Sequence, residues 1–243
     1  DMVNAGVRQA YLLPDNVLRP SILADPAGAR KNTGDNTPAV IHTELVAGNT
    51  IEVNLAAKGG GSENKAKLVM LNPSDSVADW VERTLPTMGA GWCPPGILGI
   101  GIGGTAEKAV VLAKEALMHP IDIHELRARG AATRIEELRL EIMDRVNALG
   151  IGAQGLGGLT TVLDVKIMDF PTHAASLPVA MIPNCAATRH AHFSLDGSGV
   201  AELTPPSLDQ WPVISWDVGP RARKVNLDTL TRKDIASWEP GET

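Results

Sequence analysis

The two cysteines are the residues of this sequence with the most specific chemistry. Cys93 is followed directly by two prolines, and Cys185 comes just after Pro183 and Asn184, so stiff backbone carries each thiol. Thiolates are soft ligands that select iron–sulfur clusters, zinc or copper(I). A buried free cysteine is the ordinary structural alternative. The pair therefore raises metal ligation as a hypothesis without deciding it.

A glycine-rich segment, KGGGSENK at residues 58–65, offers a second kind of chemistry. Lys58 and Lys65 flank a bare backbone around Gly61, and several N–H donors close together suit a carboxylate or a phosphate. The spacing is not that of a P-loop. A solvated turn rich in glycine and asparagine explains the same residues equally well. The segment is a candidate anion site with that alternative open.

Three histidines, His173, His190 and His192, lie near Cys185 in the sequence. Residues two apart on a strand share a face, which places His190 and His192 together and raises zinc as an alternative metal. No CxxC or HExxH motif supports zinc, and ordinary surface or core histidines have the same spacing. No GxSxG motif is present, so the sequence does not support serine-hydrolase chemistry.

The pattern GxGxxG occurs twice, at residues 99–104 and 150–155. In a dinucleotide-binding turn this pattern follows a strand, opens a helix and has an acidic residue about 20 positions later. The second copy follows a predicted helix, and the first lacks a clear acidic strand end. We interpret both as packing glycines. The turn before Thr105 nevertheless presents helix N-terminal amides, which favour anions.

Hydrophobic periodicity predicts a mixed α/β domain with short, largely antiparallel sheets flanked by helices. Pro14 ends the first helix, and Thr133 with Glu136 forms a capping box that begins the last. The helices are expected at residues 1–13, from Ser74 or Ser76 to about 85, at 106–118 and at 133–149. The strands are expected at 38–46 and 50–58, joined as a hairpin, and at 97–102, 159–170, 177–183 and 190–197.

Composition excludes several classes of protein. The chain has 243 residues, 44% of them hydrophobic, and a net charge of −6, which is typical of a folded globular protein without the basic stripe of a nucleic-acid-binding protein. Its most apolar stretches are under ten residues long, whereas a membrane span needs about 20. Two distant cysteines without a secretory leader favour free thiols and a cytoplasmic location.

Five segments together resemble the class I fumarate hydratases, the oxygen-sensitive iron–sulfur hydro-lyases related to L-tartrate dehydratase. The matching segments are NTGDNTPAVIH (32–42), AAKGGGSENK (56–65), TMGAGWCPPGILGIGIGGTAEKAV (87–110), GIGAQGLGGLTTVLDVKI (150–167) and PTHAASLPVAMIPNCAATRHAHFSLDG (171–197). These segments are long and in order along most of the chain, so they are far more specific than a glycine pattern.

The resemblance implies a 4Fe–4S cluster held by three cysteines, of which Cys93 and Cys185 match the second and third. The family's first cysteine lies in a CQDTG motif, upstream of the point where this sequence starts. The family's C-terminal domain is also absent. We therefore expect residues 1–203 to be a partial alpha domain, and residues 204–243 to be its end and a linker toward the absent domain.

The resemblance also implies roles for individual residues. Arg19 in DNVLRPS matches an arginine that binds a substrate carboxylate, Gly61 matches a backbone contact to substrate, and His173 matches a catalytic-site histidine. Further polar residues lie within matching segments: Lys58, Gln154, Thr105 and Arg189. We predict substrate contacts for the first two of these and assign no role to the others.

The resulting hypothesis is a hydro-lyase that adds water reversibly to fumarate and gives (S)-malate. The dianionic substrate must be held by cations and N–H donors, and the cluster would act as a Lewis acid. Tartrate and mesaconate stay open, because pocket contacts decide a single hydroxyl or methyl group. We expect a homodimer, and the isolated fragment to be inactive. The alternative is a non-catalytic module that binds dicarboxylates or other anions after losing the cluster.

Overall fold

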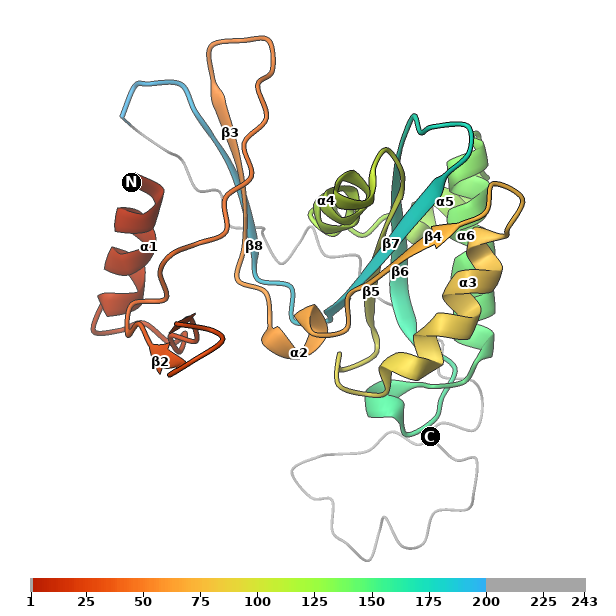
Figure 1. Ribbon diagram of the computed structural model, residues 1–243, viewed down its shortest axis with the longest axis horizontal. Coiled ribbons are helices and arrows are strands. Elements are labelled where there is room, and N and C mark those ends of the chain that lie inside the picture. Colours follow the sequence, from red (N-terminus) through yellow and green to blue (C-terminus); the bar gives the residue numbers. More distant parts are fainter. Residues whose placement is uncertain (1, 200–243) are drawn as a thin grey trace, which may run out of the picture. The chain divides into compact units, whose positions relative to one another are not determined.

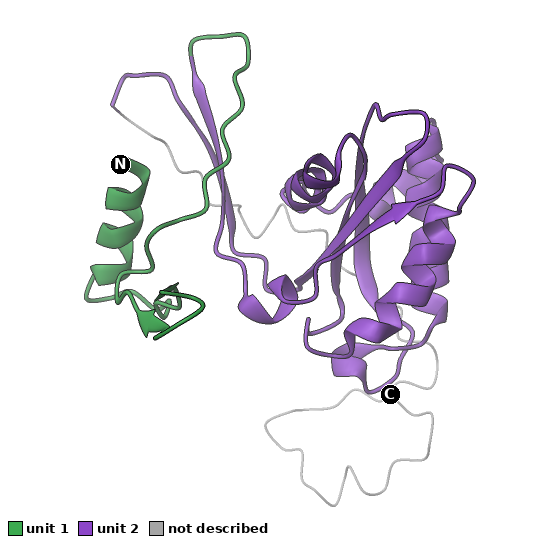
Figure 2. Ribbon diagram, viewed as in Figure 1, with its two compact units in different colours: residues 1–49 green, residues 50–243 purple. Residues whose placement is uncertain are grey.

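The computed structural model describes residues 2–199 and divides the chain into two compact units. Unit 1 comprises residues 1–49 and unit 2 comprises residues 50–243 (Figure 2). The predicted linker at residues 204–243 lies outside the described residues. Among residues 2–199, no helix combines the length and the apolar composition that crossing a membrane requires.

Unit 1 contains one helix and a minimal antiparallel pair of strands. Helix α1 (Met2–Leu12) ends before Pro14, as predicted, and β1 (Leu23–Ala24) pairs with β2 (Lys31–Asn32). Hydrogen bonds from Arg8 and Thr37 hold the pKa of Asp35 well below its usual value. Asp35 therefore stays ionised and ties residues on both sides of the β1–β2 pair together.

Unit 2 contains most of the secondary structure (Figure 1). Its elements are, in chain order, β3 (Ile51–Ala56), α2 (Gly60–Glu63), β4 (Lys67–Leu71), α3 (Val77–Thr84), the 3-10 turn η1 (Leu85–Met88), β5 (Gly96–Gly103), α4 (Ala106–Ala116), α5 (Ile123–Arg129), α6 (Arg134–Ala148), the 3-10 turn η2 (Ala153–Gly155), β6 (Val162–Phe170), β7 (Leu177–Cys185) and β8 (His190–Leu195).

The central sheet of unit 2 has the strand order β4-β7-β5-β6. Only β5 and β6 run parallel, whereas β7 is antiparallel to both β4 and β5. Helix α4 covers one face, and α3 and α6 cover the other (Figure 1). This arrangement confirms the predicted mixed, largely antiparallel α/β fold.

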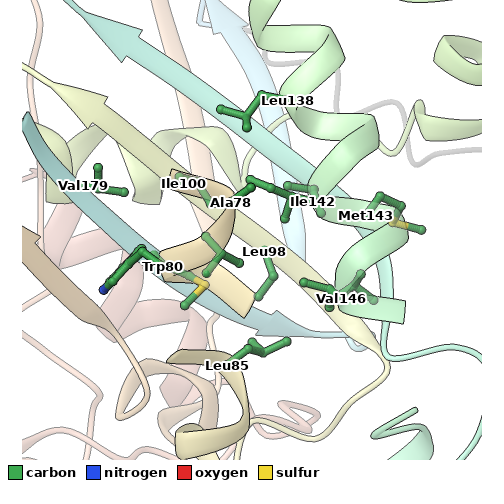
Figure 3. Packing of buried hydrophobic residues seen from close by; sticks show 14 of the residues in the cluster. Ala78, Trp80, Leu85, Leu98, Ile100, Leu138, Ile142, Met143, Val146 and Val179 are labelled. Carbon is green, nitrogen blue, oxygen red and sulfur yellow. The ribbon is translucent and has the colours of Figure 1, made fainter. Parts of the chain in front are cut away.

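The main core lies between the sheet and helices α3 and α6. Leu98 and Ile100 of β5 point to this side and meet Trp80 of α3 and Ile142 of α6 (Figure 3). Each fully buried aliphatic side chain of this kind contributes about 1.5–3 kcal/mol. The core therefore fixes β5, which leads directly from the loop that carries Cys93.

The glycines of β5 allow α4 to pack closely on the opposite face. A Cβ on Gly99 would lie 2.1 Å from the Ala113 carbonyl oxygen, and one on Gly101 would lie 2.0 Å from that of Ala109. Only hydrogen fits at these two positions, because real Cβ atoms do not approach backbone oxygen so closely. The first GxGxxG pattern thus has a packing function, in agreement with our interpretation.

A buried ionic network joins β6 to α5 and α6. The fully buried Asp164 accepts from Arg139 Nη2 at 3.1 Å and from Lys166 Nζ at 3.0 Å, and both cations also bind Asp122. Arg139 Nε donates to the Val165 carbonyl at 2.7 Å. Each cation is thus paired with both carboxylates, and this pairing offsets the free-energy cost of removing the charges from water. We call these four side chains, Asp122, Arg139, Asp164 and Lys166, the buried network.

The predicted hairpin is wrong. Residues 38–46 form no strand, and β3 pairs instead with β8, so that Val53 lies opposite Phe193 and Asn54 opposite His192. Period-two patterning identified the strand at 51–56, but it contains no information on the partner. The two strands form a ribbon whose alternation gives one apolar and one polar face.

The capping signals located the starts of α3 and α6 correctly. Ser76 and Thr133 each accept a hydrogen bond at 3.2 Å from the backbone N–H three residues later, at the starts of α3 and α6. Helix α4 begins after Thr105, although the Thr105 side chain makes no backbone cap. The sequence reasoning missed α2, β4 and α5, which are short and lack a clear apolar period.

Candidate functional site

Both cysteines lie at the same end of the central sheet. Cys185 is the last residue of β7 and pairs with Gly96, the first residue of the antiparallel neighbour β5. Cys93 lies only three residues before Gly96. Neither cysteine is in a disulfide, and Cys93 is exposed while Cys185 is half-buried. Sheet register thus brings together two thiols that are far apart in the chain.

The glycine-rich segment packs directly against the loop that carries Cys93. A Cβ on Gly61 would lie 2.6 Å from the Gly91 carbonyl oxygen, and one on Gly91 would lie 2.8 Å from Lys65 Cε. The segment is neither a hairpin end nor a loop, because Gly60–Glu63 form the one-turn helix α2. The consecutive glycines therefore serve a close backbone approach beside the thiols.

Lys58 is held almost out of solvent at this end of the sheet. Its side chain is 10% exposed, and its Nζ donates to Ser62 Oγ at 2.8 Å and pairs with Glu63 Oε2 at 3.2 Å. Burial, more than any other influence, lowers the pKa of Lys58; the charge and hydrogen bond of Glu63 are the main influences in the opposite direction, and an electrostatic interaction with Cys185 is the smallest. Lys58 is thus a positioned cation within electrostatic range of a candidate metal ligand.

Glu63 connects Lys58 to helix α4. Its carboxylate also pairs with Lys114 Nζ at 2.5 Å. Burial works to raise the pKa of Glu63, but the hydrogen bonds and charges of Lys114 and Lys58 outweigh it and hold that pKa below its usual value. Together with Arg189, described next, these residues form what we call the sheet-end cluster: Lys58, Glu63, Lys114 and Arg189.

Arg189 follows Cys185 by four residues and returns to the segment before Lys58. Its Nε donates to the Ala57 carbonyl at 3.0 Å, and the Ala57 N–H donates to the Arg189 carbonyl at 2.9 Å. His190 is next in the chain, and burial together with the charge of Lys58 lowers its pKa, so it is neutral at pH 7.

Gln154 belongs to a loop that bonds the residue after Cys93. Its backbone N–H donates to the Pro94 carbonyl at 2.7 Å, and its φ of 54° is a left-handed conformation that is uncommon for residues other than glycine. Cys93, with a φ of 58°, shares that conformation. Such outliers persist where the surroundings over-determine them, often at binding sites. The structure therefore brings Gln154, Gly61, Lys58 and both cysteines to one end of the sheet.

Two other predicted residues, His173 and Thr105, lie at the end of the sheet opposite the cysteines. His173 follows β6, whose last residue pairs with Gly103 at the far end of β5, so the eight residues of β5 separate it from the cysteine end. At about 3.3 Å per residue this is roughly 25 Å. Thr105 is also at the far end, because it directly follows Gly104. Arg19 is in unit 1, where it lines an open hollow of about 590 Å³ with Ser21 and Asn32.

The candidate zinc histidines have other contacts. His192 Nδ1 hydrogen bonds Asn54 Oδ1 at 2.8 Å across the β3–β8 ribbon, and its Nε2 lies 3.5 Å from Glu52. Within residues 2–199, no three side chains among His, Cys, Asp and Glu are placed to hold a metal ion together. A metal at the sheet end would take two sulfur ligands from the described residues.

The donor chemistry at the sheet end fits an iron–sulfur cluster as a partial ligand set. Two accessible thiols emerge from the same sheet end, and soft thiolates are the usual ligands of such clusters. Lys58, a cation of the same sheet end, interacts electrostatically with Cys185. A third ligand would have to come from outside residues 2–199.

Comparison with known proteins gives a consistent answer. The family model described as fumarate hydratase (Fumerase) matches residues 1–194. A Methanocaldococcus jannaschii protein provisionally named L(+)-tartrate dehydratase subunit alpha is 38% identical over 195 residues, covering 78% of this chain and 66% of that protein. The Leishmania major protein named fumarate hydratase 2 is 36% identical over 182 residues, which cover 71% of this chain and 32% of that protein.

A longer relative also matches the chain. The Escherichia coli protein named fumarate hydratase class I, anaerobic, is 32% identical over 208 residues, which cover 82% of this chain and 37% of that protein. The chain therefore spans between about a third and two thirds of the length of the curated relatives it matches.

Proposed function

The chain belongs to the fumarate hydratase (Fumerase) family, and on this premise we propose that it forms part of a hydro-lyase that adds water reversibly to fumarate and gives (S)-malate. The observation that carries the proposal is the family match itself, which spans residues 1–194 and includes both cysteines and every element of the sheet end. Relatives named as hydratases and dehydratases support the same class of reaction.

Cys93 and Cys185 would hold a 4Fe–4S cluster together with a third cysteine supplied from outside this chain. When bound, the cluster would supply a Lewis acid that polarises the substrate. The support from this chain is the common sheet end of the two thiols, together with the nearly buried ammonium of Lys58 at that end. Oxygen-sensitive clusters and free thiols favour a reducing compartment, so we retain the cytoplasm as the expected location.

The remaining residues of the sheet end would bind and orient the dicarboxylate. Gly61 lets backbone approach the loop of Cys93, and Gln154 is held against Pro94 by its own backbone. Lys58 supplies positive charge at the sheet end. Within unit 1, Arg19 is a separate candidate ligand for a substrate carboxylate, and the residues that line its hollow include no aspartate or glutamate. Cations and N–H donors of this kind would hold the dianion and stabilise the negative charge on its carboxylates.

His173 requires a second copy of the chain if it acts beside the cysteines. Within one copy the length of β5 separates it from them, so we propose that the homodimer places His173 of one subunit at the sheet end of the other. Mixed dimers test this arrangement, with His173→Ala in one subunit and Cys185→Ala in the other. One complete site would form and restore activity, whereas inactive mixed dimers would contradict the shared site.

A partner domain or subunit would complete the active site. The chain covers 66% of the alpha-subunit relative but only 37% of the longer fumarate hydratase, so similar relatives carry different amounts of additional chain. We propose that such a C-terminal domain or second subunit supplies the residues that this chain lacks, and that residues 204–243 lead toward it. For that reason we expect the fragment alone to be inactive.

Three alternatives differ in how well they are supported. A non-catalytic dicarboxylate-binding module is not favoured, because curated enzymes match the whole sheet end. L(+)-tartrate is a second candidate substrate, since alpha subunits of L(+)-tartrate dehydratase are among the relatives. Mesaconate also stays a candidate, because its extra methyl group changes only pocket contacts.

The test uses the full-length protein purified and reconstituted without oxygen. Hydration of fumarate, dehydration of L(+)-tartrate and iron content are measured for the wild type and for Cys185→Ala. Ser74→Ala, in the exposed turn between β4 and α3, is the matched control. We expect the cysteine variant alone to lose both bound iron and activity. Unchanged iron and turnover in Cys185→Ala would overturn the proposal, and preference for tartrate would change the assigned substrate.

A further inference from the structure

Arg189 lacks the carboxylate partner that most arginines of residues 2–199 have. Ion pairs with aspartate or glutamate are formed by Arg8, Arg127, Arg129, Arg134, Arg139 and Arg145. Within the described part of the chain, the Arg189 guanidinium bonds through Nε alone, which donates to the Ala57 carbonyl at 3.0 Å. Its two terminal nitrogens therefore keep their N–H donors for a ligand.

The Ala57 carbonyl also fixes where those donors lie. A Cβ on Gly59 would be 3.8 Å from Arg189 Nη2, so the free edge of the guanidinium lies over the start of the glycine-rich segment. The backbone of residue 57 bonds that of residue 189 in return, at 2.9 Å, which holds the chain of Arg189 in place. An arginine oriented in this way loses less entropy when it binds a planar anion.

The charges around Arg189 favour an anion. The sheet-end cluster contains three cations and one carboxylate, in a chain whose net charge is −6. Lys58 and Lys114 both direct their ammonium groups to Glu63, and Lys58 is nearly buried. Arg189 is the exposed cation of the group, and its free edge is open to a ligand that arrives from solvent.

We propose that Arg189 binds a carboxylate of the dicarboxylate substrate, through parallel hydrogen bonds from its free edge, close to Cys185. A guanidinium fork matches a carboxylate in a two-bond geometry that an ammonium group does not reproduce. This assignment rests on the proposed hydro-lyase function, and it adds a substrate-binding residue to which the resemblance gives no role. Lys58 strengthens the local positive charge but contacts the protein through Ser62 and Glu63.

The experiment measures binding separately from turnover. Succinate, a saturated four-carbon dicarboxylate that cannot be hydrated, is titrated by calorimetry into the anaerobically reconstituted full-length protein. KM for fumarate, iron content and the thermal unfolding midpoint are measured on the same samples. The variants are Arg189→Gln and Arg189→Lys. The matched control is Arg83→Gln, because Arg83 Nε also donates to a backbone carbonyl, that of Asp79 at 3.2 Å, on helix α3.

We expect Arg189→Gln to raise the succinate Kd and the fumarate KM by about 10- to 100-fold, because that is the loss of affinity that follows from losing a charge-assisted hydrogen bond. Arg189→Lys should recover only part of this loss, since it keeps the charge but not the fork. Iron content and the unfolding midpoint should match those of Arg83→Gln. An unchanged Kd, or a fall in iron content or unfolding midpoint at constant Kd, would overturn the assignment and leave Arg189 a structural residue.

Two outcomes distinguish this inference from the proposed function. If the wild type binds succinate through Arg189 but neither hydrates fumarate nor dehydrates tartrate, the proposed function fails and Arg189 remains a carboxylate ligand. If the wild type is an active hydro-lyase and Arg189→Gln behaves like the control, only the role of Arg189 fails. A wild type that does not bind succinate contradicts the role of Arg189 directly.

Discussion

Unit 2 contains two groups of charged side chains built from the same residue types, and they differ in how completely the charges are paired. In the buried network, Arg139 and Lys166 each bind both Asp122 and Asp164. In the sheet-end cluster, Glu63 serves two lysines, and Arg189 binds only a carbonyl oxygen. The fully paired charges of the buried network stabilise the fold. The N–H donors that Arg189 leaves unpaired are available to a ligand at the end of the sheet that carries the thiols.

The largest effect should come from opening the buried network. Asp164→Asn would leave two buried cations with a single carboxylate, and we expect the free energy of unfolding to fall by about 3–5 kcal/mol. Glu63→Gln should cost less, because the Glu63 side chain is 47% exposed, Ser62 Oγ still accepts from Lys58, and an exposed pair contributes little. Urea denaturation followed by circular dichroism gives both values. Equal losses would remove the distinction between the two groups.

Acid should affect the buried network next. Burial raises the pKa of Asp122, but hydrogen bonds from Arg139 and Lys166 outweigh it and lower that pKa to about 2. A carboxyl whose pKa is lower in the folded state contributes stability above its unfolded pKa, near 4, and loses it as the pH falls toward about 2. Unfolding midpoints measured across this range should fall less steeply for Asp122→Asn than for the wild type. Parallel curves would contradict the assigned pairing.

Salt should have the smallest effect, and it should act on the sheet-end cluster. Exposed charges are screened when the Debye length falls from about 10 Å at 0.1 M to about 3 Å at 1 M salt. We therefore expect succinate affinity at Arg189 to fall several-fold over this range, while Asp164→Asn costs nearly the same stability at both concentrations. Calorimetry and urea denaturation at the two ionic strengths measure these quantities. Succinate binding that is insensitive to salt would show that the sheet-end cluster does not bind succinate through charge.

Local signals predicted the elements well, and pairing poorly. The capping residues Ser76 and Thr133 located α3 and α6, because a cap acts within three residues of its own position. The strand at 51–56 was recognised, but its partner was not, since β8 lies more than 130 residues later. Alternating side chains identify a strand and its two faces, and any complementary strand can satisfy them.

The candidate site shows the same division. The types and surroundings of Cys93 and Cys185 indicated soft-metal chemistry, and the resemblance of whole segments indicated the family, which the family match confirms. The position of His173 at the opposite end of the sheet from the cysteines followed from no local pattern. Arg189 had no assigned role until its contact with Ala57 was known, because only folding brings residues 57 and 189 together.

The amino-acid sequence alone determined the class of fold, most helices, the close-packing glycines of β5 and the family, because each depends on residue types within a short segment. The tertiary structure decided which residues share a site. Antiparallel pairing of β5 with β7 joins two cysteines 92 positions apart, and the same strand separates them from His173. Proximity of this kind depends on which strands pair and in which direction, and that choice is made by the packing of the whole core.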